Sequence, residues 1–387
     1  MMAEMTKNMQ GANELRSAKR LVIKAGSALL LDQAANPATR WLSELGTDIA
    51  KLRSYGAQIC IVSSGAIGIG KSRLKLEGRL KLEEKQAAAA AGQSQLMQAW
   101  QNALQPHGLI TAQILLTLAD TENRRRYLNA RATIETLLEV GAVPIINEND
   151  TIATDEIRYG DNDRLAAHVA QMCGADALVM LTDIDGLYDA DPHKSPTAQH
   201  ISLVDEITAE IAQMGGGANT KTGLGSGGMA TKIEAAKIAA AAGCWTYVAK
   251  GDIHQPLSAL LAGEKCTRFK PNASPEKARR SWIAGQLKPA GKIIVDDGAA
   301  KALHNDASLL SAGITAIDGD FYKGDTVSLH TGEDVVIAQG ISSYDSADLR
   351  EIIGLQSSDI EHKIGYRRAA VIHRNDLVLL NGQKEKK

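Results

Sequence analysis

The chain has 387 residues, a formal net charge of −2, 44% hydrophobic residues and 23% charged residues. This length predicts two domains, and the composition is typical of a globular protein without a broad affinity for nucleic acid or anionic membranes. Its four cysteines contain no CxxC pair, which indicates reduced thiols and a cytoplasmic location instead of a zinc site or a disulfide framework.

Both ends of the chain are polar. Residues 1–19 lack the apolar centre of a secretory signal, so they are predicted to be a flexible N-terminal extension. Residues 381–387 are predicted to be a solvated tail. No apolar run approaches the roughly 20 residues that span a bilayer, so no association with a membrane is expected.

Between residues 20 and 265, short apolar runs alternate with longer Ala-rich helical patterns. Strands are predicted at Leu21–Ala25, Gln58–Ser64, Leu109–Leu116, Ala142–Asn147, Ala177–Asp183 and Thr246–Lys250. Helices are predicted at Thr39–Tyr55, Lys85–Leu104, Thr121–Val140, Asp163–Cys173 and Met229–Ala242. The strand patterns are apolar almost throughout, which predicts an α/β domain with a mainly parallel open sheet sandwiched by helices. Ligands of such sheets bind at the carboxyl ends of the strands.

The pattern changes after residue 265. Residues 266–288 are rich in charge and proline and are predicted to be a linker. Residues 289–380 contain short β-type runs (KIIVD, DTVSLH, DVVIAQG and AVIHRNDLVLL) and one helix-like stretch near Gly298–His304, which predicts a small β-barrel-like domain.

The segment VIKAGS places Lys24 at the end of a buried strand, followed by a Gly-Ser turn. Its ammonium group could reach a phosphate over the edge of the sheet, because Gly26 lets the backbone approach closely. A lysine that only extends from a strand end to solvent is the alternative.

The segment from Gly65 to Ser72, GAIGIGKS, matches the P-loop pattern GxxxxGK[ST] after a strand. A P-loop nucleotidase is therefore one hypothesis. A helix that starts near Ser64 fits equally well, since Ile67 and Ile69 are unusual in a phosphate loop. In that interpretation Ser64 and Gly65 form an anion site at a helix N-terminus, suited to a substrate carboxylate.

An acidic segment follows the strand that ends near Asn147. It has six acidic residues and three asparagines in seventeen positions, and most of it is predicted to be a solvated loop. Asn147, Asp150 and Asn162 flank a buried strand end and a helix start. A carboxylate there could bind a substrate ammonium group or hold catalytic lysines in register.

Two further segments indicate a nucleotide site. Strand ALVML delivers Thr182 and Asp183 to the edge of the sheet, although an ordinary Asp-Gly turn is an equal alternative. The second segment is a glycine-rich turn that runs into a helix whose first turn carries Thr231 and Lys232, an arrangement that favours phosphate binding. The predicted nucleotide residues of this segment are Ser226, Gly227, Gly228, Met229, Ala230, Thr231 and Lys232.

These motifs supply lysines, glycine-rich turns and an acidic anchor, but no clear general base. A carboxylate acceptor needs none, because it is already ionised near neutral pH. Positioning, lysines and Mg²⁺ suffice to transfer a phosphoryl group to it.

Several strings resemble the amino-acid kinase family, and within it the branch that phosphorylates glutamate: VIKAGS, SSGAIGIG, PIINENDTIATDEI, GDND, LTDIDGLYDADP and GSGGMATK. The resemblance covers residues from Arg20 to about Leu380 and implies that the C-terminal part is a PUA domain. It also implies that GAIGIGKS is not a P-loop.

The resemblance implies ATP-dependent phosphorylation of the L-glutamate side-chain carboxylate to glutamyl 5-phosphate, the first step of proline biosynthesis. Lys24 and Lys232 would stabilise the transferring group, with Asp150 as a third catalytic residue. Ser64, Asp150 and Asn162 would bind glutamate. Thr182, Asp183 and the run from Ser226 to Lys232 would bind ATP.

By the same resemblance, ATP and Mg²⁺ are expected as cofactors, proline as a feedback inhibitor, and a homo-oligomer (dimer or tetramer) as the assembly. The sequence identifies no residues that hold the metal. Acetylglutamate, aspartate and carbamate kinases share the fold and stay open as alternatives by fold alone. Residues 289–387 contain 11 Lys and Arg and 15 Asp and Glu, so RNA binding by the PUA domain is not favoured.

Overall fold

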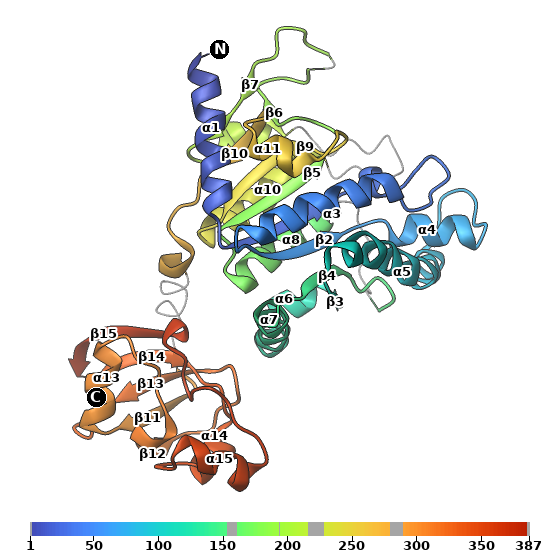
Figure 1. Ribbon diagram of the computed structural model, residues 1–387. Coiled ribbons are helices and arrows are strands. Elements are labelled where there is room, and N and C mark those ends of the chain that lie inside the picture. Colours follow the sequence, from blue (N-terminus) through green and yellow to red (C-terminus); the bar gives the residue numbers. More distant parts are fainter. Residues whose placement is uncertain (1, 153–160, 193, 216–227, 279–288, 385–387) are drawn as a thin grey trace. The chain divides into compact units, whose positions relative to one another are not determined.

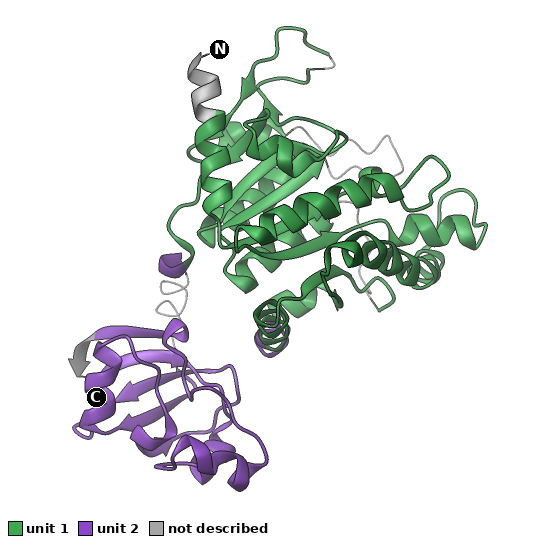
Figure 2. Cartoon of the chain, in the orientation of Figure 1, with its two compact units in different colours: residues 1–122, 129–275 green, residues 123–128, 276–387 purple. Residues whose placement is uncertain are grey.

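The structure is a computed structural model that describes residues 2–152, 161–192, 194–215, 228–278 and 289–384 (Figure 1). It contains two compact units (Figure 2). Unit 1 consists of residues 1–122 and 129–275, and unit 2 consists of residues 123–128 and 276–387.

Unit 1 is built on an eight-stranded sheet with the order β3-β4-β2-β1-β5-β9-β10-β8. All neighbours are parallel except β9 and β10. The strands are β1 (Arg20–Ala25), β2 (Gln58–Ser63), β3 (Thr111–Leu116), β4 (Val143–Glu148), β5 (Ala177–Thr182), β8 (Leu203–Val204), β9 (Trp245–Lys250) and β10 (Cys266–Phe269), with a separate hairpin of β6 (Leu187–Tyr188) and β7 (His200–Ile201). The predicted mainly parallel sheet is confirmed.

Helices cover both faces of this sheet, and Figure 1 shows α3 crossing one of them. The helices are α1 (Met2–Ser17), α2 (Ser27–Leu30), α3 (Thr39–Ser54), α4 (Ala66–Arg73), α5 (Leu82–Leu104), α6 (Leu118–Glu122), α7 (Arg124–Glu139), α8 (Asp161–Cys173), α9 (Ala209–Met214), α10 (Met229–Ala241) and α11 (Pro256–Leu261). Within the described residues, no helix is long and apolar enough to cross a membrane.

The alternation of side chains along β1 decides where Lys24 points. Leu21, Ile23 and Ala25 are fully buried in the core that also contains residues of α3, α5 and α11. Successive side chains of a strand point to opposite faces, so Val22 and Lys24 face the other layer. Helix α8 packs against β1, and α10 packs against α8. Lys24 therefore lies on the side of the sheet that α8 and α10 cover.

The predicted flexible extension at residues 1–19 is wrong, because residues 2–17 form helix α1. Ala12 and Leu15 are buried, and the Tyr247 hydroxyl donates to the carbonyl oxygen of Gly11. Arg268 Nη1 donates to Glu14 Oε2 at 2.8 Å, and the Arg268 side chain is 1% exposed. Partners on β9 and β10, far away in the sequence, hold this polar helix in place.

Unit 2 contains a five-stranded sheet with the order β12-β11-β13-β14-β15. Its elements are β11 (Gly291–Val295), α13 (Asp297–His304), β12 (Ile314–Asp318), β13 (Thr326–His330), β14 (Val335–Ile341), α14 (Ser346–Glu351), α15 (Ser357–Ile364) and β15 (Leu377–Lys384). Only β11 and β13 are parallel among these pairs, and the sheet has a core of its own. The small β domain is confirmed, but the linker predicted from residue 266 begins too early, because Cys266–Phe269 is strand β10.

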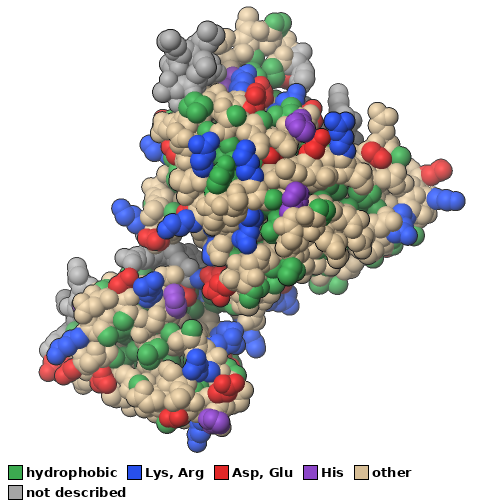
Figure 3. Space-filling model, viewed as in Figure 1, with side chains coloured by type: hydrophobic (Ala, Val, Ile, Leu, Met, Phe, Trp, Pro, Cys, Tyr) green, Lys and Arg blue, Asp and Glu red, His purple; other side chains and the backbone are tan. Residues whose placement is uncertain are grey.

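On the face shown in Figure 3, basic and acidic side chains are interspersed over each unit. This distribution agrees with the formal net charge of −2.

Candidate active site

Two buried lysines meet over one buried carboxylate. Lys24 lies near the end of β1, Lys232 lies in the first turn of α10, and Asp163 lies in the first turn of α8. Lys24 Nζ is 2.7 Å from Asp163 Oδ1, and Lys232 Nζ is 3.2 Å from Asp163 Oδ2. The residues are 7%, 5% and 0% exposed, respectively. The two lysines that the sequence predicted to act together therefore do share one site.

The charges in this cluster shift the pKa values of its members. Burial acts to raise the pKa of Asp163, but the charges of Lys24 and Lys232 outweigh it and hold that pKa at about 2. Burial lowers the pKa of Lys232 from its ordinary value of 10.5, although Asp163 opposes this shift. With both lysines protonated, two positive charges face one negative charge, and the cluster can attract an anion.

Helix α10 adds a hydroxyl group and a helix N-terminus to the cluster. The Thr231 hydroxyl lies 2.8 Å from Asp163 Oδ2 and 2.8 Å from the carbonyl oxygen of Gly228, either of which can accept its proton. Gly228 is the N-cap residue, and Met229 and Ala230 follow half-buried. The unpaired N–H groups of such a helix start favour phosphate. The predicted nucleotide residues Ser226 and Gly227 lie outside the described residues.

A chain of polar side chains lies at the ends of β2 and β4. Asn162 Nδ2 donates to Ser64 Oγ at 2.7 Å and lies 3.2 Å from Asn147 Oδ1. Asn147 Nδ2 donates to Gln93 Oε1 at 2.8 Å. The Oδ1 atom of Asn162 is buried and has no hydrogen-bond partner among the described residues. A buried acceptor without a partner is costly, so this atom is available to a hydrogen-bond donor of a ligand.

Gly65 and Asp150 flank this polar chain in the sequence. Gly65 is the N-cap residue of α4 and has φ of +104°. Residues other than glycine rarely adopt this backbone conformation. Asp150 follows β4 and is 7% exposed, so a charged group is buried at this edge of the sheet.

Thr182 and Asp183 end β5 on the other side of β1. Thr182 Oγ1 donates to Asp183 Oδ1 at 2.9 Å, and the Thr182 carbonyl oxygen accepts from the N–H of Gly251 at 2.6 Å. The carboxylate of Asp183 is exposed at the edge of the sheet.

The P-loop hypothesis is not supported, because residues 66–73 of the matching segment form helix α4 instead of a loop. The second glycine of the pattern serves helix packing: a Cβ atom on Gly70 would lie 1.7 Å from the carbonyl oxygen of Ala88 in α5. Lys71 Nζ donates to the carbonyl oxygen of Gly78. The match to the pattern is a coincidence of composition.

No role is predicted for Asp163 from the sequence, although it lies in the string GDND and at the start of a predicted helix. An acidic residue in the first turn of a helix is common, since it interacts favourably with the helix dipole. The only signal for a further role was its position directly after Asn162, at the edge of the sheet where the other motifs converge.

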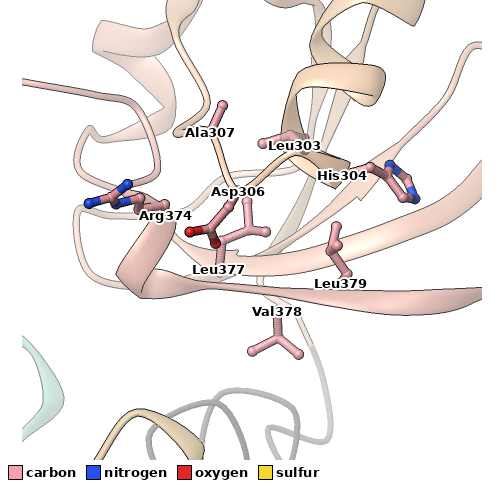
Figure 4. Close-up of a pocket in the computed structure, with 8 residues that line it drawn as sticks. All are labelled: Leu303, His304, Asp306, Ala307, Arg374, Leu377, Val378 and Leu379. Atoms are coloured by element: carbon pink, nitrogen blue, oxygen red, sulfur yellow. The ribbon is translucent and has the colours of Figure 1, made fainter.

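A shallow hollow in unit 2 contains none of the predicted site residues. Figure 4 shows the residues that line it: Leu303, His304, Asp306, Ala307, Arg374, Leu377, Val378 and Leu379. The convergence of charged and polar groups described above lies in unit 1.

Comparison with known proteins gives similarities over both units. Residues 19–250 match the amino acid kinase family, and residues 291–364 match the PUA domain. A glutamate 5-kinase of Caulobacter vibrioides is 56% identical over 377 residues, which cover 97% of this chain and 100% of that protein. A glutamate 5-kinase of Brucella anthropi is 54% identical over 368 residues, which cover 95% and 97%. Among solved structures, UMP kinase from Bacillus anthracis covers 66% of this chain and 97% of its own, with 15% identity and a TM-score of 0.48.

Proposed function

The chain belongs to the amino acid kinase family and, within it, to the glutamate 5-kinases with a C-terminal PUA domain. On this premise we propose that it transfers the γ-phosphoryl group of ATP to the side-chain carboxylate of L-glutamate. The products are glutamyl 5-phosphate and ADP, and the reaction is the first step of proline biosynthesis.

The observation that carries this proposal is the strand order β4-β2-β1-β5. Asp150 follows β4, Ser64 follows β2, Lys24 is the residue before the last one of β1, and Thr182 ends β5. Neighbouring strands are about 4.8 Å apart, so these four residues lie in the same order along one edge of the sheet. The proposed acceptor side at β4 and β2 and the proposed donor side at β5 flank the strand that carries Lys24.

The chemistry requires only that two anions be brought together in line. An oxygen of the glutamate side-chain carboxylate forms a bond to the γ-phosphorus, and the bond from that phosphorus to the β,γ-bridging oxygen breaks. The electron pair of that bond leaves with ADP. The acceptor is ionised at neutral pH, so no proton has to be removed.

Lys24 and Lys232 would stabilise the negative charge on the transferring group, as preorganised donors do. Asp163 contacts both ammonium groups, so it would act through them as a positioning residue. Thr231 would hold the second oxygen of that carboxylate in place.

The hydrogen-bonded polar side chains at the ends of β2 and β4 would recognise glutamate. The partnerless Oδ1 of Asn162 suits a substrate ammonium group, and the carboxylate of Asp150 could share that charge. Ser64 and the N-terminus of α4, which Gly65 caps, would bind a substrate carboxylate.

Thr182, Asp183 and residues 226–232 would bind ATP. Mg²⁺ is expected to enter with the nucleotide, since it is bound mainly by phosphate oxygens, waters and one or two protein carboxylates. The exposed carboxylate of Asp183 fits that donor set. The ion would supply charge neutralisation between the phosphate groups.

We also propose that L-proline inhibits the enzyme, that the chain forms a homo-oligomer, and that the PUA domain has a structural or regulatory role over residues 289–380. An assay with increasing proline and the molar mass in solution test the first two.

The reaction is tested with ATP, Mg²⁺ and hydroxylamine, which converts an acyl phosphate to a hydroxamate. Glutamate, aspartate and acetylglutamate are compared as acceptors. Hydroxamate from glutamate alone is the expected result. Folded protein that gives no hydroxamate with any acceptor would exclude the proposed reaction.

A further inference from the structure

The turn that follows β5 is packed tightly against strand β10. Gly186, within this turn, has φ of +146°, and a Cβ atom there would lie 2.4 Å from Thr267 Oγ1. The N–H of Leu187 donates to Thr267 Oγ1 at 2.7 Å, and that hydroxyl donates to the carbonyl oxygen of Ile201 at 2.6 Å. Thr267 is fully buried. The middle of the turn is therefore fixed to β10 and to the hairpin strand β7.

Three polar side chains brace the same turn on either side of Gly186. The Tyr188 hydroxyl donates to the carboxylate of Asp185, with distances of 2.9 Å and 3.1 Å to its two oxygens. Lys265 Nζ donates to the Tyr188 hydroxyl at 2.8 Å and lies 3.2 Å from Asp185 Oδ2. Lys265 directly precedes β10, so it ties Asp185 and Tyr188 to the strand that also carries Thr267.

These side chains are half-buried, which makes the bracing stronger than an exposed ion pair. The side chain of Lys265 is 35% exposed and that of Asp185 is 29% exposed. Burial acts to raise the pKa of Asp185, but the Tyr188 hydroxyl and Lys265 lower it. Burial acts to lower the pKa of Lys265, but Tyr188 and Asp185 raise it. Both groups therefore stay charged across the neutral range.

We infer that Lys265 is a positioning residue for the nucleotide: through Asp185 and Tyr188 it fixes the turn whose first residue, Asp183, faces the triphosphate. This inference rests on the proposed assignment of Thr182 and Asp183 to ATP. Displacement of this turn would affect only the part of the site that is proposed to bind ATP. The proposed glutamate side lies beyond β1, at the ends of β2 and β4.

The chain provides a matched control at the other end of the same strand. Lys270 directly follows β10, and its Nζ lies 3.2 Å from Asp205 Oδ1, with exposed fractions of 52% and 69% for the two side chains. K265M and K270M each remove one ammonium group and one ion pair next to β10. Only K265M removes a contact to the nucleotide turn.

The test measures KM for ATP, KM for glutamate and kcat of both variants, together with the binding of a non-hydrolysable ATP analogue without glutamate. For K265M we expect KM for ATP and the dissociation constant of the analogue to rise about fivefold to tenfold. KM for glutamate should stay within about twofold of the unmodified chain. K265R, which restores the charge, should recover part of the loss, and K270M should match the unmodified chain.

Y188F removes only the hydroxyl group that links Lys265 to Asp185, so it should shift the same two quantities in the same direction. The inference is overturned if K265M and K270M give equal nucleotide affinities, or if K265M raises both KM values together. If the unmodified chain forms no glutamyl phosphate but K265M still weakens analogue binding, the proposed function fails and the positioning role stands.

Discussion

Lys24 Nζ lies 2.7 Å from Asp163 Oδ1, with both side chains almost completely buried. The other oxygen of the same carboxylate lies 3.2 Å from Lys232. A buried carboxylate that contacts two buried ammonium groups is costly to remove, because each cation loses its partner in a medium of low dielectric constant.

Asp163→Asn keeps the shape of the side chain but removes its charge. We expect kcat to fall by at least about a hundredfold, since the ammonium groups of both lysines would no longer be held in position. The free energy of unfolding should fall by about 3–5 kcal/mol, as for other broken buried ion pairs. Measurements of kcat and urea unfolding check this result. Glu234→Gln, which breaks the exposed pair with Lys237, is the control and should cost less than about 1 kcal/mol.

Substitution of single lysines distinguishes the proposed kinase mechanism from the P-loop hypothesis. Lys24→Met and Lys232→Met should each lower kcat by about 10²–10³-fold, because in the proposed mechanism each removes a charge that would stabilise the transferring group. Lys71→Met should leave kcat unchanged, since Lys71 Nζ donates to the carbonyl oxygen of Gly78 at the surface, away from the cluster of Lys24, Asp163 and Lys232. Loss of activity in Lys71→Met alone would restore the P-loop hypothesis.

The pH dependence of kcat should report Lys232. Its pKa is below the ordinary value of 10.5, so the ammonium form that the proposed mechanism uses is lost at a lower pH than for an exposed lysine. The alkaline limb of kcat should therefore begin below pH 10.5. Arginine stays protonated to about pH 12 or higher, so Lys232→Arg should move the limb to higher pH, even if its maximum is lower. Superimposable alkaline limbs would contradict the assignment.

The pH dependence of stability should report Asp163. Its folded pKa, about 2, lies below its ordinary value of 3.8, so unfolding takes up a proton in this range. The stability that the ion pairs contribute is fully present above pH 3.8 and is lost as the pH falls through about 2. The difference in unfolding free energy between the unmodified chain and Asp163→Asn should shrink over that interval. A difference that is constant down to pH 2 would contradict it.

The crossing of α4 and α5 should not tolerate a methyl group. In Gly70→Ala the new Cβ atom would lie 1.7 Å from the carbonyl oxygen of Ala88, so the helices must separate. We expect a loss of at least about 1–3 kcal/mol in urea unfolding, as for other overpacked interiors. Gly332→Ala, with open space around the new atom, is the control and should change stability by less than about 0.5 kcal/mol.

The alternation of the central parallel strands with helices in unit 1 was predictable because buried strands have almost continuously apolar sequences. The predicted strand at Leu21–Ala25 and helix at Asp163–Cys173 differ from β1 and α8 only at their ends. Helix α1 was not predictable in this way. Its sequence is polar apart from a narrow apolar stripe, and the residues that hold it, Tyr247 and Arg268, come from strands more than 200 residues later.

The candidate site was predictable as a set of motifs but not as a geometry. Lys24 and Lys232 were assigned from their positions at a strand end and a helix start, which local sequence reveals. The role of Asp163 depends on the distance between β1, α8 and α10, which local sequence does not contain. The role of Lys265 was not predictable for the same reason. Its partners Asp185 and Tyr188 are far from it in the sequence, and only the fold brings them together.

The three charged residues of the cluster are synthesised in the order of the sequence: Lys24 with β1, then Asp163 with α8, and Lys232 last with α10. Until α10 is synthesised, the first lysine and the carboxylate can form only a neutral pair. We therefore expect a nascent chain to gain the second ammonium group of the cluster only when α10 docks against α8.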